Sequence, residues 1–229
     1  MEISLCQNKS AQIEQFLALS AKTRQQLAGV INKYPAAIGD IEHLKQVSAE
    51  QLQNAIVSLQ GFSLSLSECA ETGVNPWDDR RFLELCLKQL KMTVSQEYLD
   101  NLASDDIVEG YTLENIQIFR NMRFMEICGY SLEDVLTFPW PNLYERSTTI
   151  TDKVLERVRE AIETTRVLAA NTENHYMKER ASSTRQVVEV GFRYIGPLFS
   201  SPGKPSGYLI SCRAKMLDEM PSRHELRFL

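Results

Sequence analysis

The chain has 229 residues, of which 43% are hydrophobic and 24% are charged, and its formal net charge is −5. This length can bury one large core or two small ones. The mild acidity argues against nucleic acid as the main partner, because DNA-binding domains usually carry a basic surface. No apolar run reaches the roughly 20 residues that cross a bilayer, and the N-terminus lacks a basic segment followed by an apolar one. We therefore expect a cytoplasmic protein with no membrane segment and no secretory signal.

The cysteines indicate free thiols in a reducing compartment. Disulfide scaffolds and zinc sites use paired or clustered cysteines. Here the number is odd, no CxxC pair occurs, and the positions are scattered: Cys6, Cys69, Cys86, Cys128 and Cys212. We expect neither a disulfide framework nor a metal site.

The first hundred or so residues are predicted to be helical. Apolar residues recur at helical spacing from Ser10 to Tyr34-Pro35, where the proline disfavours helix in the residue before it. A second helix is predicted after Ser48, which forms a capping-box pattern with Gln51. It runs into Gly61–Leu66, where alternating residues fit a short strand on pattern alone. The helical surroundings favour helix there.

Two further helices are predicted after a turn at Thr72–Pro76. Asp78 or Asp79 can cap the first of them. Its apolar residues cover most of its circumference, which predicts that it is buried. Ser95 can cap a second, short helix. The sequence therefore predicts an α-helical N-terminal region over residues 1–105.

Beyond residue 105 the pattern changes to short strands and helices. Alternating apolar residues predict a strand over 107–119. Two short helices follow, one closed by Gly129 and one with a box-like cap at Ser131. Phe138-Pro-Trp-Pro is too rich in proline for regular structure.

An amphipathic helix and three strands complete the predicted order. The helix begins behind Thr151 or Asp152. In the strongest predicted strand, Phe192 and Tyr194 alternate in step with the valines that precede them, so these side chains are expected on one face. The strands are His175–Arg180, Arg185–Phe199 and Tyr208–Met216, with a loop at Ser200–Gly207 before the last. This order predicts an α+β fold, in which helices cover one side of an antiparallel sheet.

One segment resembles the signature of PAS sensory domains: an asparagine, an aromatic residue three positions on, then Gly-Tyr-Ser and an acidic helix. The matching positions are Asn121, Phe124, Gly129, Tyr130, Ser131, Glu133 and Leu136. Gly129 would end a helix in a conformation that glycine tolerates best, and Gly207-Tyr-Leu-Ile-Ser is similar to the last PAS strand. The resemblance implies a PAS-like antiparallel sheet with flanking helices over 106–218, preceded by the helical region 1–105 and followed by a tail, 219–229.

Two segments depart from the family pattern. Trp140-Pro-Asn-Leu-Tyr-Glu stands where the family often has a His-Pro-Asp-like turn. Lys215-Met-Leu-Asp-Glu-Met stands where an Asp-Ile-Thr-like exit is usual, which argues against coupling to an effector through the usual linker. We also expect no kinase, cyclase or DNA-binding domain after Met220.

The resemblance implies an interior pocket lined or flanked by large apolar side chains, with simple core packing as the alternative. The candidate ligand-binding residues are Phe119, Phe124, Met125, Trp140, Tyr144, Phe192 and Tyr194. A small apolar or aromatic molecule would suit this lining. Bound haem is not expected because the helix 152–164 lacks histidine, and flavin photochemistry is not expected because no Asn-Cys-Arg-Phe-type motif occurs. The sequence assigns no cofactor, and His43, His175 and His224 are expected to be surface or structural residues.

No nucleophile elbow, Cys/His arrangement or phosphate loop is present, so we expect a signalling protein rather than an enzyme. The PAS-like domain is expected to sense a small ligand or to dock a protein partner, and to relay the signal through the N-terminal helices and homodimerisation. The helices Ile13–Ile31 and Leu83–Leu90 are the expected interfaces, because their apolar seams exceed what a small domain covers. The alternative is a ligand-responsive transcription regulator that binds DNA through the helical region, where Lys22-Thr-Arg-Gln-Gln and Arg80-Arg81 are basic. An enzyme on this scaffold would rest on the fold alone.

Overall fold

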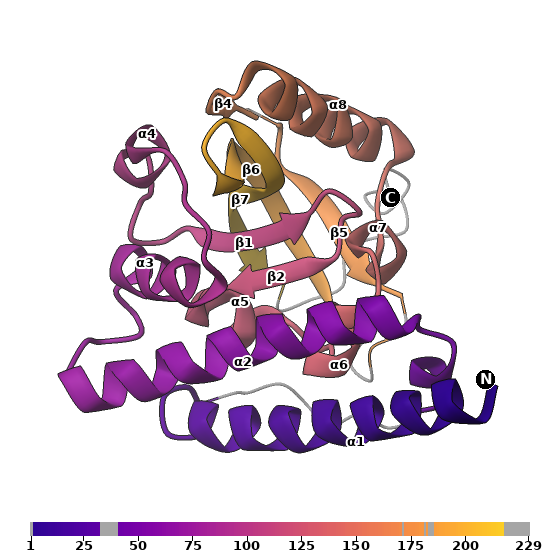
Figure 1. The fold of residues 1–229 in the computed structure, drawn as a ribbon. Coiled ribbons are helices and arrows are strands. Elements are labelled where there is room, and N and C mark those ends of the chain that lie inside the picture. The colour runs from indigo at the N-terminus through magenta and orange to yellow at the C-terminus, as the bar shows by residue number, and fades with distance from the viewer. Residues whose placement is uncertain (1, 33–40, 171, 181, 183–185, 218–229) are drawn as a thin grey trace.

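A computed structural model describes residues 2–32, 41–170, 172–180, 182 and 186–217 (Figure 1). Four α-helices form the N-terminal half: α1 (Glu2–Leu27), α2 (Ala49–Thr72), α3 (Asp79–Leu90) and α4 (Gln96–Asp100). A short 3-10 helix, Glu42–Lys45, follows α1 in the chain, and its His43 ring stacks on Phe138. The long helices α1 and α2 lie side by side, with α2 between α1 and the sheet (Figure 1).

The predicted helix caps are present in this half. The Ser48 side chain accepts from Gln51 N, and the Gln51 side chain accepts from Ser48 N, so the capping box is confirmed. Asp78 caps α3 and Ser95 caps α4. Helix α2 continues through Gly61–Leu66, as the helical surroundings predicted. The predicted stop at Tyr34-Pro35 lies outside the described residues, as do His224 and the tail.

The second half is an antiparallel sheet with helices inserted between its strands. The strands are β1 (Ile107–Thr112), β2 (Gln117–Arg120), β3 (Tyr144–Glu145), β4 (Leu168–Ala169), β5 (His175–Glu179), β6 (Val187–Ser201) and β7 (Lys204–Met216). They stand in the order β2-β1-β7-β6-β5-β3, with β4 paired to β6. The first strand therefore lies inside the sheet, hydrogen-bonded to both β2 and the last strand, and the predicted α+β class is confirmed.

Two predicted strand boundaries are wrong. The single strand expected over 107–119 is a hairpin, in which β1 and β2 are joined by a turn that holds Asn115 at a φ of 65°. Asparagine tolerates this left-handed conformation better than most residues. The loop expected at Ser200–Gly207 is a tight turn around Gly203, whose φ is 72°, and strand pairing resumes at Lys204.

The inserted helices are α5 (Met122–Ile127), α6 (Leu132–Thr137), α7 (Trp140–Leu143) and α8 (Thr148–Thr164). Ser131 caps α6 in a capping box with Asp134, as predicted. The prediction for Gly129 is wrong, because α5 ends earlier at an extended Cys128 and Gly129 has no positive φ.

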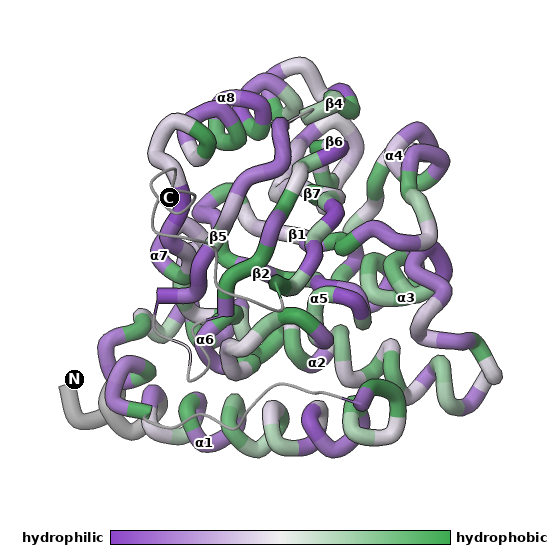
Figure 2. The backbone as a smooth tube through the Cα atoms, turned by 180° about the vertical axis from the view of Figure 1, so that it is seen from behind, coloured by the Kyte–Doolittle hydropathy of each residue, from purple (hydrophilic) through white to green (hydrophobic). Residues whose placement is uncertain are grey.

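The proline-rich segment forms one helical turn, α7, with a proline in its first two positions, where the missing N–H would be unpaired anyway. The amphipathic helix α8 begins behind Ser147, earlier than predicted, and this residue makes no side-chain cap. Along α8, hydrophilic and hydrophobic segments alternate, as expected for a helix with one buried face (Figure 2). No described helix is both long and apolar enough to cross a membrane.

Helices cover both faces of the sheet, which corrects the expectation of one covered side. The inner face carries Glu109 and Tyr111 of β1 and is covered by α5 and α7. The outer face carries the alternate positions, including Gly110, and is covered by α3 and α4. There the Phe82 and Phe119 rings lie 6.1 Å apart, and a Cβ added to Gly196 would lie 2.6 Å from the Tyr98 ring.

This arrangement removes the reason for placing an interface on α1 or α3. The apolar residues of α3 are buried against the protein's own sheet and α2, and those of α1 face α2. The buried seam residues are Phe16 and Leu27 of α1 and Phe82, Leu83, Cys86 and Leu87 of α3. One continuous hydrophobic core includes residues from both halves of the chain.

Candidate functional site

Four of the seven predicted ligand-binding residues line two small cavities on the inner face of the sheet. Phe124 and Tyr144 line the first cavity, and Trp140, Tyr144 and Phe192 line the second. Each cavity has a volume of about 20 Å³. That volume holds roughly one water molecule. The two cavities share Glu109, Tyr144, Met177 and Val190 in their walls.

The other three predicted residues lie elsewhere. Phe119 projects from the outer face against Phe82. Met125 is buried in α5 but lines neither cavity. Tyr194 follows a β-bulge that shifts the register between Phe192 and Tyr194, and its half-buried ring contacts the Arg193 guanidinium, 5.4 Å from the ring centroid. A bulge inserts one unpaired residue and so reverses the face on which later residues point.

Glu109 is a buried carboxylate between the two cavities. Its Oε2 accepts hydrogen bonds from Tyr111 OH and from Gln117 Nε2, the latter at 2.9 Å. Burial raises the pKa of Glu109, against the lowering effects of the Tyr111 hydrogen bond and the charges of Arg146 and Arg120. The group therefore stands close to two cations but forms no ion pair within 4.0 Å with any described residue.

Arg120 and Arg146 are those cations, and both are buried without a hydrogen-bond partner. Arg120 is 3% exposed and Arg146 is 8% exposed. In each, the Nε and Nη1 atoms have no hydrogen-bond partner among the described residues. Burial lowers the pKa of each guanidinium to about 10, so both remain protonated at neutral pH. Buried charges normally have a hydrogen-bonded partner of opposite sign, and these two do not.

Aromatic rings hold the Arg146 side chain in place. Its guanidinium carbon lies 4.0 Å from the Trp140 ring centroid and 5.4 Å from that of Phe192. A guanidinium that stacks through its flat face leaves its N–H groups free at the edge. Because Arg146 lines the second cavity, a group that enters this cavity meets those donors.

Sequence reasoning missed Glu109, Arg120 and Arg146 because it searched the pocket for apolar and aromatic residues. One signal was available. Glu109 alternates with Ile107 and Tyr111 and so points to the same face of the strand, which the apolar pattern predicts to be buried. A charged residue at such a position must be paired or functional in the folded chain. No comparable signal marks Arg146, which lies in a connection between β3 and α8.

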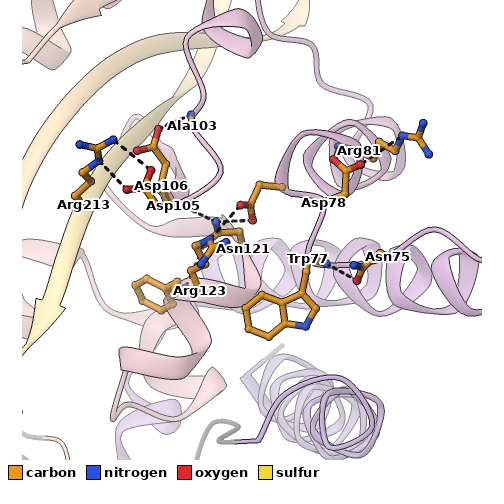
Figure 3. Close-up of polar contacts among 12 residues, drawn as sticks. Asn75, Trp77, Asp78, Arg81, Ala103, Asp105, Asp106, Asn121, Arg123 and Arg213 are labelled. Atoms are coloured by element: carbon orange, nitrogen blue, oxygen red, sulfur yellow. Dashed lines mark hydrogen bonds and ion pairs between the residues drawn. The ribbon is translucent and has the colours of Figure 1, made fainter.

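A second polar cluster joins the helical region to the PAS-like domain (Figure 3). The Asn121 Nδ2 group donates to Asp79 Oδ1 at 2.9 Å and to the Asp106 carbonyl at 2.8 Å, while its Oδ1 caps α5 by accepting from Phe124 N. Arg123 lies beside Asn121, 3.4 Å from Asp79 Oδ2, and also over the Trp77 ring. Burial raises the pKa of Asp79, and Asn121 and Arg123 oppose that rise.

Two buried acids extend this connection. Glu133 of α6, which is fully buried, pairs with Arg24 of α1 at 2.8 Å. Asp106, also fully buried, pairs with Arg193 of β6 at 2.5 Å. The motif residues Asn121 and Glu133 thus hold α5 against α3 and α6 against α1.

The basic residues of the helical region are largely occupied by acids of the same region. Arg80 pairs with Glu84 and Asp100, and Arg81 pairs with Asp78. Such pairs are exposed and weak, but they place a negative charge beside each of these two arginines. Among the described residues, no cluster of three or more histidine, cysteine or acidic side chains could hold a metal ion.

The element order, the pairing of β1 with both β2 and the last strand, and the Asn121–Leu136 segment define a PAS-like fold, as the sequence resemblance predicted. Solved structures that match include a PAS domain from Colwellia psychrerythraea, with 18% identity over 48% of this chain and 86% of that chain and a TM-score of 0.36. A sensory box sensor histidine kinase from Vibrio cholerae matches with 11% identity, coverage of 53% and 89%, and a TM-score of 0.31.

The PAS-B domain of Drosophila melanogaster Cycle with bound ethylene glycol matches with 9% identity, coverage of 48% and 99%, and a TM-score of 0.37. No protein-family model and no curated protein matches the chain. At these identities and scores the neighbours carry no argument about activity. The fold assignment stands on the strand order and motif residues described above.

Proposed function

We propose that the chain is a signalling module whose PAS-like domain senses a small molecule at the inner face of the sheet. The observation that carries this proposal is the pair of buried guanidinium groups whose Nε and Nη1 atoms have no partner among the described residues: Arg146, which lines the second cavity, and Arg120, whose charge acts on Glu109 between the cavities. A buried donor left without a partner costs about 1–3 kcal/mol, and a charged donor costs more, so a ligand that accepts from these groups would be stabilised by them. A signalling role, rather than catalysis, remains our expectation.

The relay from this site would run through α5 and α6 into the helical region. Phe124 of α5 lines the first cavity, and Asn121 at the start of the same helix holds Asp79 of α3. Glu133 of α6 holds Arg24 of α1. A molecule that displaces Phe124 would therefore change the positions of helices bonded to α1 and α3.

A cavity-filling substitution tests this relay without a ligand. Val190→Ile adds one methylene at a residue that lines both cavities, and Val57→Ile makes the same change on an exposed position of α2. We expect Val190→Ile to change amide hydrogen exchange in α5, α6, α1 and α3, and Val57→Ile to leave exchange in the sheet unaltered. Exchange changes confined to β5–β7 would refute the relay.

Native mass spectrometry and thermal-shift screening test the sensing step itself. A co-purifying small molecule, or stabilisation by a member of a screened library, would support it. A protein that carries nothing and responds to nothing would favour docking of a protein partner at this domain. Homodimerisation is part of the proposal, and light scattering that gives a clean monomer at high concentration would remove it.

Binding to DNA through the helical region remains the alternative function. The pairing of Arg80 and Arg81 with acids weakens it. A mobility-shift assay at modest salt decides the question, because phosphate contacts give a strongly salt-dependent affinity.

A further inference from the structure

The charges of the inner face do not balance. Arg120 and Arg146 are both cationic, and Glu109 is the one carboxylate that acts on both of them. Glu179 also lines the first cavity, but it is not among the charges that act on either guanidinium. Its carboxylate accepts from Gly129 N at 2.6 Å, from Gln186 N at 3.2 Å and from Ser182 OH. With Glu109 ionised, Arg120, Arg146 and Glu109 together carry one net positive charge.

The N–H donors of the two guanidinium groups also lack hydrogen-bond acceptors. Four guanidinium atoms, Nε and Nη1 of each arginine, have no hydrogen-bond acceptor among the described residues. Glu109 Oε2 is engaged by Tyr111 and Gln117. Water molecules in the two cavities could accept from single N–H groups, but water cannot neutralise the excess charge.

A carboxylate supplies both missing partners. Its two oxygens match the two parallel N–H groups at the edge of a guanidinium, and such bidentate pairs are among the strong hydrogen bonds of proteins. Stacking on Trp140 and Phe192 fixes the plane of Arg146 so that this edge is preorganised. One negative charge would bring the cluster of Arg120, Arg146 and Glu109 to neutrality.

The other residues that line the two cavities determine the size and polarity of the part of the ligand beyond its carboxylate. Apart from Glu109 and Glu179, the first cavity is bounded mainly by apolar groups, including Ile107, Val188 and Ala214. Each cavity is smaller than a carboxylic acid, but Met177 forms part of both walls and is only half-buried. An unbranched methionine side chain changes rotamer readily, and its displacement would join the two cavities.

We propose that the two cavities beside Glu109 form one site for a small monocarboxylic acid with a short apolar chain, bound by the N–H groups of Arg146 and attracted by the nearby charge of Arg120. This inference rests on the proposed function, since it names the chemical class of the molecule that the inner face senses. A dicarboxylate would leave an excess negative charge there, and an amine would add to the positive charge.

Paired acids and amides test the inference on the unmodified chain. Formate, acetate, propionate and butyrate would be compared with formamide, acetamide, propionamide and butyramide by calorimetry and thermal shift. Each pair has nearly the same shape and differs in charge. We expect at least one acid to bind at least tenfold more tightly than its amide, with the chain length of the best acid reporting the joined volume.

Substitution of the arginines then locates the site. Arg146→Met and Arg120→Met keep most of the side-chain volume and remove the charge, and Arg213→Met is the matched control at an exposed arginine paired with Asp105. We expect the dissociation constant of the best acid to rise at least tenfold in the first two variants and to stay unchanged in the third. If a core variant fails to fold, the acid–amide comparison on the unmodified chain still decides.

Three outcomes would overturn the inference. Equal affinity for acids and amides would show that the charge is not recognised, although a sensing site would remain. Equal loss of affinity in the Arg213→Met variant would place binding on the surface. No binding of any probe, together with altered hydrogen exchange in the Val190→Ile variant, would leave the proposed relay standing and reject the carboxylate ligand.

Discussion

Replacement of Asn121 by alanine tests whether the junction of Figure 3 holds the two halves of the protein together. The side chain is fully buried and makes three hydrogen bonds: one that caps α5, one to the Asp79 carboxylate and one to the Asp106 carbonyl. Loss of the cap costs about 1 kcal/mol. A buried acceptor left without a donor costs about 1–3 kcal/mol.

We therefore expect Asn121→Ala to lower the free energy of unfolding by about 2–4 kcal/mol. For a chain of this size that corresponds to a fall in Tm of roughly 5–15 °C. Urea unfolding followed by circular dichroism measures the loss. The control is Asn101→Ala, which removes one hydrogen bond from a half-exposed side chain at the end of α4, to Glu97 O. Equal destabilisation by the two substitutions would refute the reasoning.

Asn121→Asp refines the test. The cap acceptor is retained, but the donor to Asp79 becomes a second carboxylate. Like charges at this distance raise the pKa of the pair above the value in the unfolded chain, so the folded form binds a proton more tightly. The destabilisation relative to the unmodified protein should therefore shrink as the pH falls from 7 to 5. A constant difference over this range would contradict the expectation.

Three further predictions follow from buried groups. Gly196→Ala places a Cβ 2.6 Å from the Tyr98 ring and should cost about 1–3 kcal/mol in urea unfolding, whereas Gly29→Ala, whose Cβ would have 3.6 Å of clearance, should be nearly neutral. Burial lowers the pKa of His175, so the folded state resists its protonation. The free energy of unfolding should then fall as the pH drops below about 6.5, the pKa of an unfolded histidine. His175→Phe should reduce this fall, and identical dependence on pH in the variant and the unmodified protein would exclude a contribution from His175. In a Cys6→Ser background the four remaining thiols, all buried, should react with a thiol reagent only after denaturation; rapid labelling under native conditions would contradict this.

Local patterns in the sequence predicted the helix caps and the order of elements. A capping box depends only on side chains three residues apart, so the motifs at Ser48 and Ser131 predict where their helices begin without knowledge of the fold. The PAS-like order could be predicted for the same reason, because its motif residues are contiguous from Asn121 to Leu136. Gly129 shows the limit of this reasoning. A glycine after a predicted helix indicates a left-handed helix end at that glycine, but α5 ends one residue earlier, at Cys128.

The direction of side chains could not be predicted, because it depends on features without a clear sequence signal. The bulge before Tyr194 moves that residue off the parity of Phe192. The hairpin turn at Asn115 splits the expected strand, and an irregularity between Gly110 and Tyr111 sets the face on which Phe119 lies. The apolar residues of α3 predict an external interface because the sequence does not reveal that the sheet has a second face, which α3 covers.

The contact between Tyr98 and Gly196 makes sequence changes in the helical half depend on sequence changes in the sheet. A ring from α4 occupies the space that a side chain on β6 would need, so neither position can change size alone. Pairs in spatial contact tend to vary together among related sequences. Relatives that carry a larger residue in place of Gly196 should carry a smaller one in place of Tyr98, and the helical half should have been inherited together with the sheet as one evolutionary unit.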